Sequence, residues 1–148
     1  MKAVAYNIKP FEKEFLAKAN QKKHDITLIA NPLGLDTVIY AEGKDAAIVF
    51  TDDDVSAPII KKLASLGVKY IVTRSAETGH IDKKAAAAYG IKISNIPSYP
   101  LQPNITSEDL QQVANQTIKN LDQWQQNKCV GKACACEKDC KGPEVGKS

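Results

Sequence analysis

Five short apolar runs, spaced regularly along the first hundred residues, constrain the fold of this chain more than any other feature. The runs are residues 2–6, 26–30, 46–50, 70–72 and 91–93. Segments with helical spacing separate them, and Pro, Gly and Asn stand at the junctions. The run 46–50 is apolar without interruption, which is typical of a strand buried on both faces of a sheet. This alternation predicts an α/β fold built on a parallel sheet.

The segments between the apolar runs carry the start and stop signals of helices. We expect these helices at residues 10–22, 35–41, 56–66 and 82–89. Ser56 and Asp82 are suitable N-caps, and Gly67 and Gly90 follow the last turns. Because crossovers between parallel strands are right-handed, the leading topology is a flavodoxin-like five-stranded parallel sheet with helices on both faces. Binding sites in such sheets gather beyond the C-terminal strand ends.

The C-terminal third of the chain divides into a connector, a helix and a tail. Residues 96–105 contain three prolines and predict an extended connector. Thr106 caps a final amphipathic helix over 106–127, with Asp109 in the capping-box position, and this helix should pack back on the sheet. We therefore expect a flavodoxin-like domain at residues 1–127 and a mobile Cys-rich tail at residues 128–148.

Composition excludes several classes of protein. The chain has 148 residues and a formal charge of +3, which is too small to argue for nucleic-acid binding. Its apolar runs are far shorter than the ~20 residues that cross a bilayer. The N-terminus also lacks the apolar core and cleavage site of a signal peptide. We expect a cytoplasmic protein without nucleic-acid or membrane partners.

All four cysteines fall within the last twenty residues. Cys129, Cys134, Cys136 and Cys140 are candidate metal ligands, for a tetrahedral zinc ion or an iron–sulfur cluster. The spacing x4, x, x3 fits neither family well, and the central C-x-C is typical of chelators for soft metals. Neighbouring lysines would lower the thiol pKa values and favour metal binding or redox chemistry. A reactive tail without a fixed role remains the alternative.

Two features bear on nucleotide and phosphoryl chemistry. The chain contains neither G-x-G-x-x-G nor G-x-x-x-x-G-K-[ST], so we expect no nucleotide cofactor to be bound by this chain alone. The acidic run 52–54 follows a predicted strand and could hold Mg²⁺. We favour the other interpretation, in which these carboxylates stabilise the start of the next helix.

The two histidines differ in their sequence surroundings. We expect His24 to be solvated, because it lies in a Lys-Lys-His-Asp turn. His80 ends the loop 74–80, where Glu77 could form an acid–base pair with it and Arg74 could hold an anion. We favour a polar loop in which Asp82 caps the next helix.

Several stretches of residues 1–99 resemble the N-terminal part of the D-2-hydroxyacid dehydrogenases, most closely the D-lactate dehydrogenases. The matching stretches are residues 9–16 (KPFEKEFL), 49–54 (VFTDDD), 67–74 (GVKYIVTR), 81–92, in which Ile81-Asp82, Ala85-Ala86 and 89–92 (YGIK) carry the match, and 95–99 (NIPSY). Residues 106–121 are also similar to the last helix of those enzymes. The resemblance implies the flavodoxin-like fold of their substrate domain.

The family inserts a nicotinamide-binding domain after the position of Tyr99, together with an Arg and a Glu–His pair that act on the substrate. About six residues stand there in this chain. The resemblance therefore covers the substrate domain only and implies an NAD-dependent oxidoreductase family whose hydride chemistry belongs to the bound cofactor.

The resemblance also supplies candidate substrate-binding residues. Tyr99 matches the tyrosine that lies near the substrate, and Ala76 and Glu77 lie in the loop whose backbone amides hold the substrate carboxylate. The family usually has Gly at the position of Glu77. A carboxylate there would repel an anionic substrate. With Arg74, these residues are the binding candidates, and we assign no catalytic residue.

Three hypotheses for function follow. The chain is a binding or regulatory module that is not catalytic alone, with an oligomer or a protein partner at the C-terminal strand ends. Alternatively, it is one component of an NAD-dependent oxidoreductase whose cofactor domain belongs to another chain. In the third hypothesis, the Cys-rich tail handles metal or thiols and the α/β domain is a scaffold.

Overall fold

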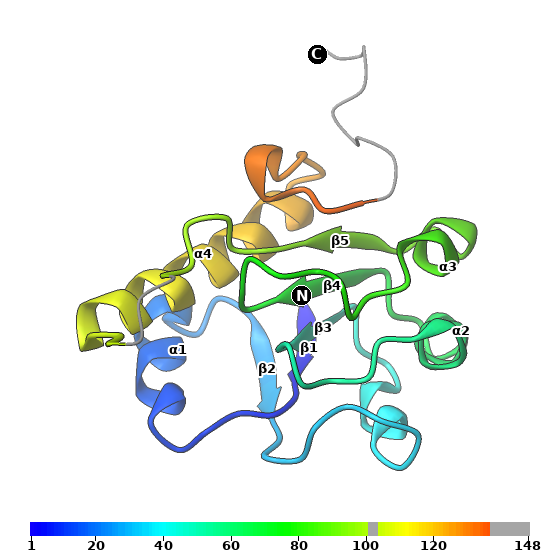
Figure 1. Ribbon diagram of the computed structural model, residues 1–148, viewed down its shortest axis with the longest axis horizontal. Helices are drawn as coiled ribbons and strands as arrows, with labels where there is room; N and C mark the ends of the chain where they lie inside the picture. The colour runs from blue at the N-terminus through cyan, green and yellow to red at the C-terminus, as the bar shows by residue number, and fades with distance from the viewer. Residues whose placement is uncertain (101–103, 137–148) are drawn as a thin grey trace.

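The computed structural model describes residues 1–100 and 104–136. Five strands form one sheet: β1 (Lys2–Ala5), β2 (Asp25–Leu28), β3 (Ala46–Val49), β4 (Tyr70–Thr73) and β5 (Lys92–Ser94). All pairings are parallel, and the order is β2-β1-β3-β4-β5 (Figure 1). This is the flavodoxin-like order that the sequence predicts.

Helices cover both faces of the sheet, as Figure 1 shows. On one face lie α1 (Glu12–Asn20) and α4 (Ser107–Gln125). On the other lie α2 (Ala57–Ser65), α3 (Lys83–Ala88) and the 3-10 turn η1 (Val38–Ala41). The expected helix at 35–41 is thus a single 3-10 turn. Each face has its own apolar cluster, because alternate side chains of β1, β3 and β4 point to opposite sides.

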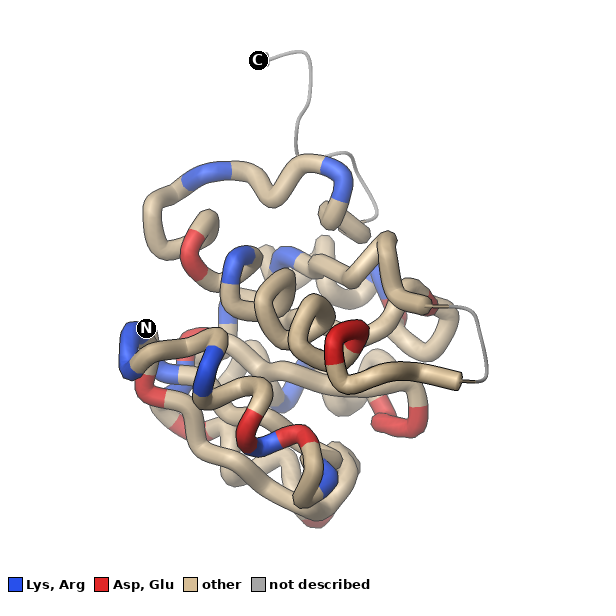
Figure 2. Tube along the Cα trace, turned by 90° about the vertical axis from the view of Figure 1, so that its left-hand side faces the viewer, with Lys and Arg blue, Asp and Glu red and all other residues tan. Residues whose placement is uncertain are grey.

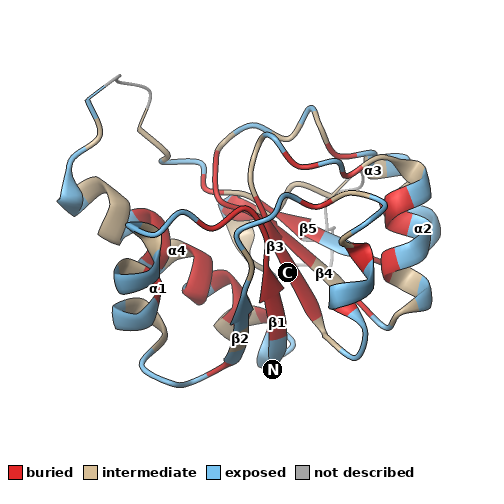
Figure 3. Ribbon diagram, turned by 90° about the horizontal axis from the view of Figure 1, so that it is seen from below, coloured by how far each residue is buried: buried red, intermediate tan, exposed pale blue. Residues whose placement is uncertain are grey.

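Burial separates the central strands from the edge. All four residues of β3 are buried, whereas β2 has no fully buried residue (Figure 3). The uninterrupted apolar run at 46–50 is therefore the middle of the sheet, where both faces are covered. The run at 26–30 forms an edge strand.

The final helix docks on the sheet as predicted. Thr106 accepts a hydrogen bond from the Asp109 N–H at 3.1 Å, and Asp109 accepts one from the Thr106 N–H at 3.0 Å, which completes a capping box. At the other end of α4, the buried Trp124 stacks on Tyr70 of β4, with ring centroids 4.7 Å apart. The apolar side chains of α4 pack with those of α1 in the cluster on this face of the sheet.

Residues 128–136 are bonded to the rest of the fold, and residues 133–136 among them pack along β5, so the expectation of a mobile tail from Asn127 onward is wrong for this part. They contain a 3-10 turn, η2 (Gly131–Ala133), and an antiparallel bridge between Cys134 and Ser94. Asn95 N–H donates to the Ala133 carbonyl at 2.8 Å, and Ala135 N–H donates to the Ile93 carbonyl at 2.9 Å. This segment thereby satisfies backbone groups at the outer margin of β5.

Charges of both signs are spread over the side of the molecule that α1 and α4 form (Figure 2). Among the described residues we find no helix whose length and apolar character would let it span a bilayer.

Candidate functional site

The loops that follow β1, β3, β4 and β5 meet at one edge of the sheet, because the strands are parallel. They bring together residues from four separate matching stretches of the sequence. Arg74 and Tyr99 lie here with Glu12 and Phe50, as the contacts below describe. This edge is where the sequence predicted a site.

The Arg74 guanidinium is tied into the fold by four hydrogen bonds. Its Nη1 donates to the Tyr6 carbonyl at 3.0 Å, and its Nη2 donates to the Asn7 carbonyl at 3.1 Å. Its Nε and Nη2 donate to the two carboxylate oxygens of Glu12 at 3.1 and 3.4 Å. Arg74 is only 3% exposed. It thus joins the end of β4 to the end of β1 and the start of α1, and only part of its donor capacity is left for an anion.

Two aromatic rings complete this cluster. The Arg74 guanidinium carbon lies 5.3 Å from the centroid of the Phe50 ring, and the Tyr99 ring lies 6.1 Å from Phe50 in a tilted arrangement. Burial raises the pKa of the Tyr99 hydroxyl, and the Glu12 carboxylate adds to this, while Arg74 opposes it. Tyr99 is therefore a neutral hydrogen-bonding group at physiological pH.

Hydrogen bonds from the residues that follow β5 hold the loop after Arg74. Asn95 Nδ2 donates to the Ala76 carbonyl at 3.0 Å, and Ile96 N–H donates to the Ser75 carbonyl at 2.9 Å. Ala76 is half-buried and Glu77 is exposed. The structure thus places a carboxylate on the solvent side of the loop to which the resemblance assigns substrate binding.

His80 and Asp53 lie in the loops at the same C-terminal strand ends. Asp53 is 3% exposed and accepts hydrogen bonds from the Phe50 N–H at 2.6 Å and the Leu33 N–H at 2.8 Å. Burial raises the pKa of Asp53 against these bonds. Burial lowers the pKa of His80, opposed by Asp53 and then by Glu77. The described residues show no hydrogen bond between His80 and Glu77, so their pairing as acid and base stays a prediction.

Two carboxylates of the acidic run 52–54 accept hydrogen bonds from backbone N–H groups. Besides the two bonds to Asp53, the Asp54 carboxylate accepts a hydrogen bond from the Ser56 N–H at 3.0 Å, at the start of α2. No cluster of His, Cys, Asp or Glu able to hold a metal ion occurs in the described parts of the chain. Asp54 thus lies at the start of α2, as the favoured interpretation expects, whereas Asp53 joins the loops that follow β2 and β3. The Mg²⁺ alternative stays a prediction. Asp82 likewise caps α3, accepting the Ala85 N–H at 3.0 Å.

Three of the four candidate cysteine ligands lie in the segment beside β5. Cys129 is exposed, and Cys134 and Cys136 are half-buried. The Cys136 Sγ accepts a hydrogen bond from the Ile93 N–H at 3.3 Å, so this thiol continues the backbone pairing of the segment. Cys140 lies outside the described residues. The four-cysteine metal site stays a prediction.

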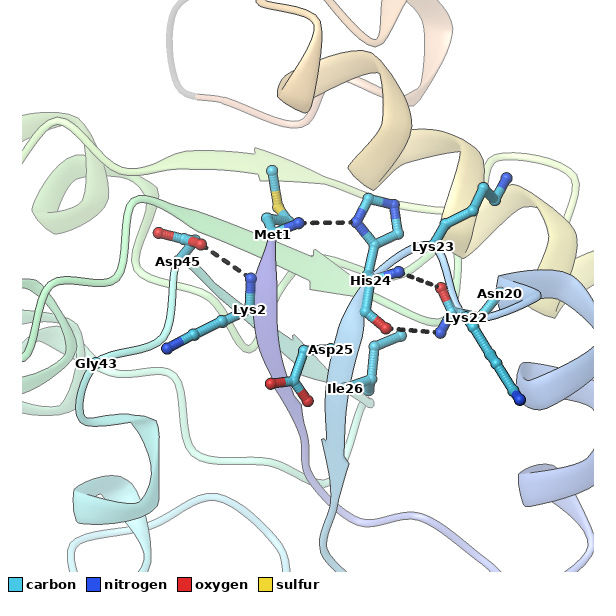
Figure 4. A pocket seen from close by; sticks show the side chains of 10 residues that line it. All are labelled: Met1, Lys2, Asn20, Lys22, Lys23, His24, Asp25, Ile26, Gly43 and Asp45. Carbon is cyan, nitrogen blue, oxygen red and sulfur yellow. Dashed lines mark hydrogen bonds between the residues drawn. The ribbon is translucent and has the colours of Figure 1, made fainter.

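An open hollow of about 870 Å³ lies at the N-terminal ends of the strands, opposite to the candidate site (Figure 4). His24 lies beside it, and the expectation that this histidine is solvated is wrong, because it is 5% exposed. Its Nε2 lies 2.7 Å from the Asp122 carboxylate, and its Nδ1 lies 3.2 Å from the Met1 amino group. His24 thereby attaches the turn before β2 to α4.

Glu12 and Phe50 were not predicted from the sequence as members of the site. Both lie in stretches that carry the family resemblance. A signal existed for Glu12, since a buried Arg requires a carboxylate partner and Glu12 begins a helix at the same edge.

The chain matches the family described as D-isomer specific 2-hydroxyacid dehydrogenase, catalytic domain, over residues 3–134. It is 32% identical over 109 residues to an aromatic 2-oxoacid reductase of Clostridium sporogenes, which covers 73% of this chain and 32% of that protein. It is also 32% identical over 100 residues to a D-lactate dehydrogenase of Escherichia coli, covering 67% of this chain and 30% of that one.

The solved apo structure of D-lactate dehydrogenase from Escherichia coli superposes with a TM-score of 0.65 at 32% identity, over 68% of this chain and 32% of that chain. D-2-hydroxyisocaproate dehydrogenase gives 0.62 at 28% identity, over 68% and 31%. The chain thus spans about a third of the length of these relatives. It belongs to the D-isomer-specific 2-hydroxyacid dehydrogenases and corresponds to their catalytic, substrate-side domain.

Proposed function

We propose that this chain is a substrate-domain homologue that does not transfer hydride alone and acts as a binding or regulatory module. The observation that carries the proposal is the connection between Tyr99 and Thr106. It has six residues, where the family resemblance places a whole nicotinamide-binding domain. A hydride donor must come from a bound cofactor, and no glycine fingerprint for one occurs in the chain.

The chemistry of the loop at 74–80 supports a changed ligand preference. Arg74 is engaged by four hydrogen bonds to the protein, and Glu77 is exposed on the loop. Two carboxylates held close together repel each other, so a 2-hydroxy acid gains little here. We infer that the surface at the strand ends binds something other than a small carboxylate in the manner of the family.

Titration of the purified chain with NADH and with D-lactate tests this proposal. We expect no binding tighter than about 1 mM, the upper end of ordinary KM values, and no NADH-dependent reduction of pyruvate. The variant Glu77→Gly should show a larger chemical shift change at the Ala76 amide with D-lactate than the unchanged chain. Stoichiometric NADH binding, or pyruvate reduction by the chain alone, would overturn the proposal.

A second candidate function is favoured by the apolar side chains near the strand ends. Phe11 is 57% exposed and Leu35 is 74% exposed, in the loops that follow β1 and β2. Such side chains would suit a partner chain that carries the cofactor domain of an NAD-dependent oxidoreductase. The chain would then supply Tyr99 and the Ala76 loop to a shared site.

Mixing the chain with the isolated nicotinamide-binding domain of a D-lactate dehydrogenase tests this second candidate. Activity on pyruvate that appears only in the mixture, and falls with Leu35→Lys, would support it. A mixture without activity, or activity indifferent to Leu35→Lys and Phe11→Lys, would reject it.

A further inference from the structure

Strand β2 is the outermost strand in the order β2-β1-β3-β4-β5. Among residues 1–100 and 104–136 it pairs with β1 on one side and with no strand on the other. Asp25, Thr27 and Leu28 are exposed, and Figure 3 shows this strand at the margin of the sheet. The opposite margin differs, because residues 133–136 run beside β5. Natural sheets commonly protect an edge with charged side chains, Lys above all, or with Pro or a bulge. Residues 25–28 contain neither Lys nor Pro, and their one charge, Asp25, lies at the first position of the strand.

Two residues of β2 direct their backbone N–H and C=O groups away from the sheet. The Asp25 N–H donates to the Met1 carbonyl at 3.0 Å, and the Ile29 N–H donates to the Ala5 carbonyl at 2.8 Å, so odd-numbered residues face β1. Because the direction alternates along a strand, the N–H and C=O groups of Ile26 and Leu28 face away from the sheet. These groups are available to another strand.

We propose that a second copy of this chain pairs with β2 in antiparallel fashion, about a two-fold axis at Thr27. In this register each Ile26 lies opposite Leu28 of the second copy. The outward groups of these residues then form two hydrogen-bonded pairs, with four hydrogen bonds in all. The side chains of Ile26 and Leu28 share one face of the sheet, so apolar meets apolar at both positions. A two-fold interface requires this self-complementarity.

On the other face of the sheet, the charged side chains of the two copies are complementary. Lys44 Nζ donates to Thr27 Oγ1 at 3.1 Å, which places this ammonium beside the proposed axis. Asp25 lies two residues along β2 on the same face, about 7–8 Å diagonally across an antiparallel pair. In Figure 4 no hydrogen bond joins the Asp25 carboxylate to the other residues drawn. Lys44 of each copy can therefore reach Asp25 of the other.

Apolar side chains beside the edge add to the surface. On the face of Thr27, Ile39 and Tyr40 are 47% and 53% exposed and line a hollow of about 590 Å³ between β2 and η1. On the face of Ile26, Leu28 is 38% exposed. Exposed apolar groups next to unpaired strand backbone are what an added strand and its flanking residues cover. An unrelated extended peptide would gain the backbone bonds but not the paired Lys44 and Asp25 contacts.

Sedimentation of the full chain tests the proposal. We expect a species of twice 16.1 kDa that dissociates on dilution. Leu28→Pro removes two of the four intermolecular hydrogen bonds and, because this N–H faces outward, none within the sheet. It should raise the dissociation constant about thirtyfold. Leu35→Lys, at the strand-end loops, is the matched control and should leave the dimer intact.

A charge exchange keeps the test independent of the proline variant. Lys44→Glu and Asp25→Lys should each weaken the dimer, and the double variant should restore it, with urea unfolding used to verify that each variant is folded. A monomer at all concentrations, or a dimer indifferent to Leu28→Pro and to the charge variants, would overturn the proposal. A dimer lost only in Leu35→Lys would also overturn it, and would place the contact at the strand ends.

Discussion

Replacing Arg74 by Ala tests whether this side chain holds the fold or waits for a ligand. The change removes the Arg74 donors of the Tyr6 and Asn7 carbonyls and of the Glu12 carboxylate, which keeps the hydrogen bond from the Lys9 N–H at 2.9 Å. Each orphaned buried acceptor costs about 1 kcal/mol or more, and the Glu12 side chain, which is 19% exposed, recovers part of its loss from water. We therefore expect a loss of about 3 kcal/mol in the free energy of unfolding, near the lower end for a broken buried ion pair.

Urea unfolding at neutral pH measures this loss. With a slope of about 1.5 kcal/mol per M, a loss of 3 kcal/mol moves the midpoint about 2 M lower. Arg74→Lys keeps the charge but not the planar fork, and should lose about half as much. Lys13→Ala, which removes an exposed cation of α1, should stay within about 0.5 kcal/mol of the unchanged chain. If Arg74→Ala also stays within about 1 kcal/mol, the structural role argued for Arg74 is refuted.

Three further predictions concern the remaining contacts of the fold. Burial raises the pKa of Asp122, but hydrogen bonds from Lys23 and His24 outweigh it and hold this pKa below its ordinary value. The stability that Asp122 contributes is thus present above about pH 4 and lost as pH falls through the lowered pKa, so unfolding of Asp122→Asn should differ less from the unchanged chain at pH 3 than at pH 7. Trp124→Ala should cost about 3–5 kcal/mol in thermal or urea unfolding, because the buried ring closes one apolar cluster. Ala133→Arg should displace the segment beside β5, visible as faster amide hydrogen exchange in β5 at a cost of about 1–3 kcal/mol.

The fold could be predicted from the sequence because its signals are local. Each apolar run became a strand, and the Thr106 and Asp82 caps start helices where expected. The segment beside β5 could not be predicted, since residues 128–136 have no periodic pattern. They are held by backbone bonds to Ile93 and Asn95, and those bonds depend on tertiary placement.

The candidate site could be located but not detailed. Parallel strands fix which loops meet, and this placed Arg74 and Tyr99 on one edge. Which donor satisfies which acceptor depends on side-chain geometry at distances of 3 Å, which no spacing encodes. The same limit applies to His24, whose polar neighbours in the chain suggested solvent exposure although α4 covers it.

The unequal margins of the sheet set how many strand partners this chain can take. Beside β5, residues 133–136 already occupy the outer row of backbone groups, while β2 leaves its row vacant. In the part of the chain that the structure describes, the sheet therefore has one margin at which a further strand can be added. Pairing two such margins about a two-fold axis occupies both of them, so growth stops at two copies and cannot continue into a fibre.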